Sequence, residues 1–289
     1  MSNIIISESA SLFSNSFQMA DFLDTSKLRL TKDFTELRNS TGRSVCPVCL
    51  NKRKYFCYDC VIPLLHSPPE PVHALPLQIH IVRHNSEKVS KSSIIPLKLV
   101  YPKNVFLYTF TQPDRFDPSK KEGSIHPSLP TLDPERTAIL FPSKDSVTVG
   151  NMDSKLFKGL VENEAESHSS IEHVIVIDST WSTARQVISK TPELKHLKLH
   201  IRLGSDSKTI FWRHQKLGRE CLATCEAIYV LLREIFDKAS PGKVYDHRYD
   251  DILFYYFFVH GLVQENYRDS KKHRGHLPDY AIEPLTIGE

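Results

Sequence analysis

The sequence has no apolar run long enough to cross a bilayer, which takes about 20 residues. Its richest apolar stretch, residues 252–259, is short and is interrupted by His260 and Gly261, so we expect a core element there. The N-terminus lacks a basic region followed by a long apolar core, and we therefore expect no secretory signal. There is also no internal repeat. These absences argue against membrane and repeat proteins and favour a protein of the nucleus or the cytosol.

An excess of charge is also missing. The 289 residues contain 37 Lys and Arg against 34 Asp and Glu, and a net charge of +3 is too small to indicate nucleic-acid binding by itself. Two local basic groups are more informative, residues 52–54 and residues 212–216, because basic and aromatic side chains together suit phosphates and bases. An ordinary solvated face remains the commoner explanation of a short basic run.

The chain length and the 40% apolar content suit one large α/β domain plus a small module. We divide the chain into a poorly ordered lead-in (1–42), a four-cysteine module (43–66), a main domain (67–265) and a tail (266–289). Two polar stretches, 111–136 and 143–172, are expected to be a surface loop and an insertion. The predicted strands are 77–82, 105–110, 137–141, 174–177 and 196–203, and the predicted helices are 34–38, 87–99, 181–190, 220–236 and 251–263. The alternation of strands and helices predicts a mostly parallel sheet.

Four of the six cysteines form two closely spaced pairs. Cys46 and Cys49 make one Cys-x-x-Cys turn, Cys57 and Cys60 make another, and seven residues separate them. Two such turns present four thiolates to one ion, which predicts a tetrahedral zinc site. Four thiolates leave no position for water, so the zinc would be structural. An iron–sulfur cluster and free thiols remain the alternatives.

An unbroken β-branched run, residues 174–177, ends on Asp178. Such a run is typical of a parallel strand that is covered on both faces, and ligands of parallel sheets bind beyond the carboxyl ends of the strands. Ser179 and Thr180 then offer N-caps to a helix that begins near Trp181. This arrangement predicts a small-molecule pocket. It is equally consistent with a capped helix whose indole fills the core.

Three motifs together resemble the DTW domain family. Asp178-Ser-Thr-Trp181 matches the family signature Asp-x-Thr-Trp, and residues 222–227 are similar to its downstream block Leu-Ser-Thr-x-Glu-Ala. The four-cysteine module ahead of His84-x-x-Glu87 resembles its N-terminal part. The resemblance covers residues 43–265 and is strongest to the eukaryotic type 1 tRNA-uridine aminocarboxypropyltransferases. One departure is Ala223, which stands where the family has serine.

The resemblance implies a transferase that acts on tRNA. Its donor would be S-adenosylmethionine, whose 3-amino-3-carboxypropyl group moves to N3 of a D-loop uridine while methylthioadenosine leaves. It also implies a SPOUT-like fold, a knotted, mostly parallel sheet with helices on both faces. Because the donor is a sulfonium, its leaving group departs as a neutral thioether. The transfer therefore needs no metal, which agrees with a closed zinc site. The uridine N–H is a weak nucleophile, so a side-chain base is expected near it.

The resemblance also suggests residue roles. Asp178 is the first candidate for the base, and binding the donor's ammonium group is an equally good role for it. Thr180 would hydrogen-bond the donor carboxylate at a helix start. The expected donor-binding residues are Leu140, Phe141, Pro142, Asp178, Thr180, Trp181, Leu222, Thr224 and Glu226. The expected RNA-binding residues are His84, Glu87, Lys91, Trp212, Arg213 and Lys216.

Two other functions remain open at this point. One is a non-enzymatic, zinc-containing RNA-binding protein in which the α/β domain is only a scaffold. The other is a SPOUT-type RNA methyltransferase that uses the same donor. A carboxylate, a hydroxyl and an indole at the end of a buried strand favour an enzyme. The released product separates the two enzymes, because methylation leaves S-adenosylhomocysteine instead of methylthioadenosine.

Overall fold

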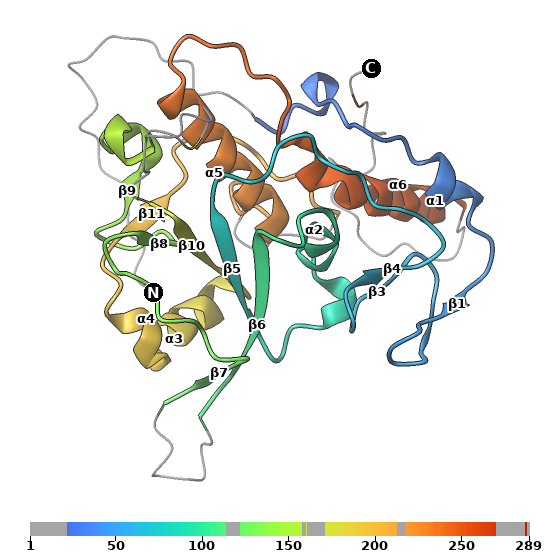
Figure 1. Cartoon of the computed structure of the whole chain (residues 1–289), viewed down its shortest axis with the longest axis horizontal. Helices are drawn as coiled ribbons and strands as arrows, with labels where there is room; N and C mark the ends of the chain where they lie inside the picture. The colour runs from blue at the N-terminus through green and yellow to red at the C-terminus, as the bar shows by residue number, and fades with distance from the viewer. Residues whose placement is uncertain are drawn as a thin grey trace.

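A computed structural model describes residues 22–113, 122–157, 160, 171–212, 218–269 and 287. Its centre is a seven-stranded sheet in the order β7-β6-β5-β10-β8-β11-β9 (Figure 1). Its strands are β5 Gln78–His84, β6 Val105–Thr111, β7 Ser124–His126, β8 Thr137–Leu140, β9 Val147–Thr148, β10 His173–Asp178 and β11 His200–Arg202. All neighbours are parallel except β6 and β7. The prediction of an α/β domain with a mostly parallel sheet is confirmed.

The central strand β10 is buried on both faces. Val174 and Val176 belong to one apolar core, whereas Ile175 and Ile177 belong to the other. This alternation explains why the strand needs β-branched residues at consecutive positions. The first core lies under helices α2 (Ile95–Val100), α5 (Thr224–Ala239) and α6 (Phe254–Asp269), and the second under α3 (Trp181–Lys190) and α4 (Pro192–Lys195). Among the described residues, no helix has the length and apolar character that a membrane crossing requires.

Helix α5 is the long apolar helix that the sequence predicts, but it begins later. Its first residue is Thr224, and Ala223 is the N-cap. The predicted start at residue 220 is therefore wrong: Cys221 precedes the helix and does not share a helical face with Cys225. Cys225 is buried, as expected for a small apolar side chain in a core.

Part of the lead-in packs on the main domain. Residues 22–40 include a 3₁₀ helix, η1 (Thr25–Lys27), and the helix α1 (Thr35–Asn39), while residues 1–21 lie outside the described residues. Leu28 and Leu37 are buried in the first core. Leu28 follows η1 and Leu37 lies in α1, so the two side chains share no helix or strand and leave no periodic pattern to detect. The backbone is also held, because the carboxylates of Asp250 and Asp251 accept N–H bonds from Arg29 and Thr31.

The two polar stretches also contain short elements. The first stretch, 111–136, contributes β7 to the edge of the sheet. The second, 143–172, contributes β9 and the 3₁₀ helices η3 (Val149–Asn151) and η4 (Ser154–Phe157). Both 3₁₀ helices pack on α5, with Val149 and Phe157 fully buried. Two further 3₁₀ helices are η2 (Val89–Lys91) and η5 (Asp250–Leu253).

The four-cysteine module consists of two small hairpins. β1 (Ser44–Val45) pairs with β2 (Lys52–Arg53), and β3 (Phe56–Cys57) pairs with β4 (Ile62–Pro63). The module docks on α6 through aromatic contacts, with the rings of Tyr55 and Phe258 4.8 Å apart between centroids. Close to this contact, the hydroxyl of Tyr255 lies 2.7 Å from Nε2 of His66. α6 thus joins the module to the main domain.

Candidate active site and metal site

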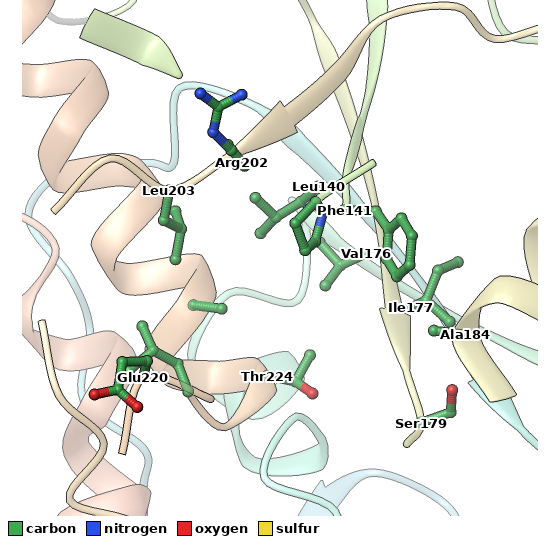
Figure 2. Close-up of a pocket in the computed structure, with 13 residues that line it drawn as sticks. Leu140, Phe141, Val176, Ile177, Ser179, Ala184, Arg202, Leu203, Glu220 and Thr224 are labelled. Carbon is green, nitrogen blue, oxygen red and sulfur yellow. The ribbon is translucent and has the colours of Figure 1, made fainter. Parts of the chain in front are cut away.

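A cavity of about 260 Å³ lies where β8, β10 and β11 end, opposite the first turn of α5. Figure 2 shows its apolar side chains grouped between α5 and β10, with Ser179 and Thr224 at one margin. The cavity is lined by Leu140, Phe141, Pro142, Val176, Ile177, Ser179, Ala184, Arg202, Leu203, Glu220, Leu222, Thr224 and Ala227. A concave apolar site with a few polar groups is typical of small-molecule binding.

The structure brings together five of the predicted donor-binding residues. Leu140 is the last residue of β8, and Phe141 and Pro142 follow it. Across the cavity, Thr224 begins α5 and Leu222 lies just before that helix. Arg202 and Glu220 also line the cavity, although neither is among the predicted site residues. Arg202 is the last residue of β11, so the same rule that located Asp178 would have found it. Nothing local marks Glu220.

Asp178 does not itself line the cavity, but its neighbours Ile177 and Ser179 and its hydrogen-bond partner Thr224 do, and its carboxylate is held at both oxygens. The hydroxyl of Thr224 donates to Oδ1 at 2.7 Å, and the hydroxyl of Ser92 donates to Oδ2 at 2.9 Å. Burial raises the pKa of Asp178, while these two hydrogen bonds and the charge of Arg83 oppose that rise. Arg83 is its partner in register on β5. The arrangement holds one carboxylate in one orientation at the cavity.

Ser92 belongs to a short segment that joins three parts of the site. Its oxygen accepts the N–H of Ile94 at 3.3 Å, which leaves its only proton for Asp178. The next residue, Ser93, accepts the N–H of Cys225 in the first turn of α5 at 3.3 Å. The segment before α2 is therefore attached to both β10 and α5. Neither serine is among the predicted site residues.

Thr180 occupies the N-cap of α3 but does not cap it with its side chain. Its hydroxyl lies 2.8 Å from the hydroxyl of Thr183, and the residue is exposed. Thr180 thus stands at the predicted N-cap position, but its hydroxyl accepts no capping hydrogen bond from the first turn of α3. Thr180 does not line the cavity. The side chain of Trp181 lies outside the described part of the structure.

Glu226 also does not line the cavity but is buried behind it. Its Oε2 accepts the N–H of Ala223 at 2.7 Å and the hydroxyl of Thr209 at 2.7 Å. Its Oε1 accepts the N–H of Ile210 at 2.9 Å and the hydroxyl of Tyr256 at 2.7 Å. Burial raises its pKa, and the four donors oppose that effect. Glu226 thus joins the start of α5 to residues 209–210 and to α6.

Three of the predicted RNA-binding residues have described side chains: His84, Glu87 and Trp212. His84 is buried, and its Nδ1 lies 2.6 Å from the hydroxyl of Ser86. Glu87 follows in the same turn and is partly exposed. Trp212 packs against Phe211 and Tyr256, with ring centroids 4.7 and 5.2 Å away. The side chains of the other three predicted residues lie outside the described part of the structure: Lys91, Arg213 and Lys216.

The four predicted zinc ligands do converge. The sulfur atoms of Cys46, Cys49, Cys57 and Cys60 all lie within 4.8 Å of one another. The residues after each pair, Leu50 and Val61, have φ values of 60° and 53°. Left-handed backbone is unfavourable for such residues, and for a β-branched one in particular.

The two turns of the module are therefore built alike. Each bends its backbone so that both of its thiols face the other turn. The N–H group of Cys49 lowers the pKa of the Cys46 thiol to about 7, which favours the thiolate that binds metal. The four residues fit a tetrahedral zinc site.

Comparison with known proteins agrees with the motifs. Residues 54–263 match the family model of the DTW domain. The protein named tRNA-uridine aminocarboxypropyltransferase 1 in Xenopus laevis is 30% identical over 84% of this chain and 86% of its own length. Its namesakes are similar too, at 31% identity over 78% of both chains in Mus musculus and 27% over 86% of both in Homo sapiens. No solved structure gives a significant match.

Proposed function

Because the chain belongs to the DTW domain family, we propose that it is a tRNA-uridine aminocarboxypropyltransferase. Its donor is S-adenosylmethionine, and its acceptor is N3 of a uridine in the tRNA D-loop. The observation that carries the proposal is the apolar cavity with the Asp178 carboxylate held beside it. The cavity suits the adenosine part of the donor, and the carboxylate suits either the acceptor N–H or the donor's ammonium group.

The reaction is a substitution at the γ-carbon of the methionine part. The bond from sulfur to this carbon breaks as the bond from uridine N3 forms. The electron pair stays on sulfur, so the positive sulfonium becomes a neutral thioether, methylthioadenosine. The N3 proton must leave, and a carboxylate is the base at hand. The enzyme's main task is to orient the γ-carbon, and not the methyl group, toward N3.

Asp178 suits the role of base for two reasons. Burial raises its pKa, which makes the carboxylate a stronger base than an exposed one. The hydroxyls of Ser92 and Thr224 each occupy one lone pair of its oxygens, so a second lone pair on each remains for another donor. The alternative role, binding the ammonium group, uses the same lone pairs.

Two finer features belong to the same proposal. The cavity lies in a SPOUT-like fold in which the chain is knotted around the donor site. The four cysteines hold a zinc ion that stabilises the module. Four thiolates fill its coordination shell, so the ion supplies no water and takes no part in the transfer.

One experiment tests the proposal, and it also distinguishes transfer of the aminocarboxypropyl group from transfer of the methyl group. Purified protein is incubated with donor labelled in its aminocarboxypropyl arm and unmodified tRNA, and the nucleosides and the small-molecule product are identified by mass spectrometry. We expect aminocarboxypropyluridine and methylthioadenosine. Formation of methylated uridine and S-adenosylhomocysteine, or an absence of any transfer to RNA, would contradict the proposal. The Asp178→Asn variant is the control for transfer at this site.

A further inference from the structure

One segment beside the cavity carries a surplus of positive charge. Residues 181–202, which run from the start of α3 to the end of β11, contain five Lys and Arg and a single acid, Glu193. Their net charge of +4 exceeds the +3 of the whole chain, so all other residues together are slightly acidic. The basic residues are Arg185, Lys190, Lys195, Lys198 and Arg202.

These side chains lie on the outer face of the molecule. In α3, Ala184 and Val187 are buried against the sheet, whereas Arg185 and Lys190 are exposed. Lys195 at the end of α4 and Lys198 after it are exposed too. Figure 1 shows α3 and α4 side by side at one margin of the sheet, and the two helices contact each other. We call the exposed side chains of Arg185, Lys190, Lys195, Lys198 and Arg202 the basic ridge.

The basic ridge begins at the candidate active site. α3 starts three residues after Asp178, and a helix rises about 1.5 Å per residue, so Arg185 is about 6 Å and Lys190 about 14 Å along the axis from Trp181. At the other end of the segment, Arg202 lines the cavity itself. In Figure 2 its guanidinium group points away from the apolar side chains.

Acidic neighbours compensate the ridge only weakly. Lys195 lies 3.3 Å from Glu122, with side-chain exposures of 48% and 57%. Exposed ion pairs contribute about 0–1 kcal/mol, and they exchange readily for a stronger anion. Glu193 is the one acid within the segment. The ridge therefore keeps a surplus of positive charge in solution.

We infer that the basic ridge binds the phosphate backbone of the tRNA and so brings the target uridine to the cavity. The inference rests on the proposed function for the identity of the polyanion. A row of cations that leads away from a catalytic cavity attracts and orients a polyanion, and phosphate contacts set register without reading sequence.

The module's basic group suits this role less well. Arg53 already pairs with Asp59 at 2.8 Å and lies over the ring of Tyr58, 4.2 Å from its centroid. In addition, four thiolates around a divalent ion carry a net negative charge, which offsets Lys52 and Lys54. The ridge has no such compensation from within its own segment beyond Glu193.

The test compares two double variants of the full chain. Lys190→Gln with Lys198→Gln removes two charges from the ridge. Lys103→Gln with Lys243→Gln removes two exposed charges that lie outside the ridge, before β6 and after α5. Binding of unmodified tRNA is measured at several salt concentrations, and binding of S-adenosylmethionine alone reports whether each variant is folded.

We expect the ridge variant to bind tRNA at least tenfold more weakly at low salt, with donor affinity unchanged. Each phosphate contact contributes about 0.7–0.9 to the slope of log K against log salt, so the slope should fall by about 1.4–1.8. The control variant should keep the wild-type slope. An unchanged slope in the ridge variant, or an equal loss in the control, would overturn the inference. Neither result would affect the proposed transfer, which the nucleoside analysis tests separately.

Discussion

The Glu226→Gln substitution tests how the buried carboxylate holds the site together. Each of its oxygens accepts one backbone N–H, from Ala223 or from Ile210, and one hydroxyl. A glutamine keeps one oxygen and replaces the other by an NH₂ group. Whichever way the amide turns, one backbone N–H then faces a donor, whereas the neighbouring hydroxyl can rotate to accept.

The expected cost follows from that geometry. A hydrogen bond to a charged group contributes about 1.5–3 kcal/mol, and an unpaired buried N–H costs about 1–3 kcal/mol. Part of this free-energy cost is offset by the removal of a buried charge. Burial raises the pKa of Glu226, which means that the ionised carboxylate is disfavoured in the fold. We therefore expect Glu226→Gln to lower the free energy of unfolding by about 3 kcal/mol.

Urea denaturation followed by tryptophan fluorescence measures this change. Trp212 is a suitable reporter, because its ring centroid lies 5.2 Å from that of Tyr256, which donates to Glu226. The matched control is Glu193→Gln, an exposed acid in the first turn of α4, which should change stability by less than about 0.5 kcal/mol. A change that small in Glu226→Gln as well would refute the reasoning.

Four other expectations concern the site, the metal and the core. Asp178→Asn should abolish transfer without loss of stability at neutral pH, because a raised folded-state pKa means that the ionised carboxyl destabilises the fold; transfer assays and thermal unfolding check both parts. Replacing Cys46 and Cys49 by serine should remove one bound zinc per chain and lower the melting temperature, and an unchanged metal content by mass spectrometry would contradict the zinc site. Leu50→Gly should stabilise the metal-bound module by about 1 kcal/mol, since glycine accepts a φ of 60° without strain and the Leu50 side chain is exposed, and competition with a chelator would show it as tighter zinc binding. Burial lowers the pKa of His80 to about 4. The neutral side chain therefore contributes its full stability above about pH 6.5, and this contribution is lost as the pH falls toward 4. His80→Phe should make the free energy of unfolding in urea depend less on pH in that range.

The features that the sequence predicts are those with a strong local pattern. Four consecutive β-branched residues identify β10, and the rule for carboxyl ends of parallel strands then places Asp178 at the cavity. The spacing of the cysteines likewise identifies a four-sulfur cluster. In each case a few neighbouring residues contain the whole signal.

The features that the sequence analysis missed depend on tertiary neighbours. Ser92 is 86 residues from Asp178, and it reaches that carboxylate only because β5 pairs with β10. Val149 and Phe157 lie in elements of three and four residues, which are too short for a hydrophobic period. Glu226 resembles any acid in a first helical turn until its four partners are known. Pairing between distant segments decides all of these positions, and no local window contains it.

Two adjacent tyrosines of α6 have a practical consequence for anyone who shortens this chain. Tyr255 contacts His66 in the cysteine module, and the next residue, Tyr256, donates to Glu226 behind the cavity. A fragment that starts after residue 66 would leave the aromatic side of α6 open to water and loosen the helix whose other side supports the cavity. Minimal versions of this protein should therefore retain the module, even where metal binding is of no interest.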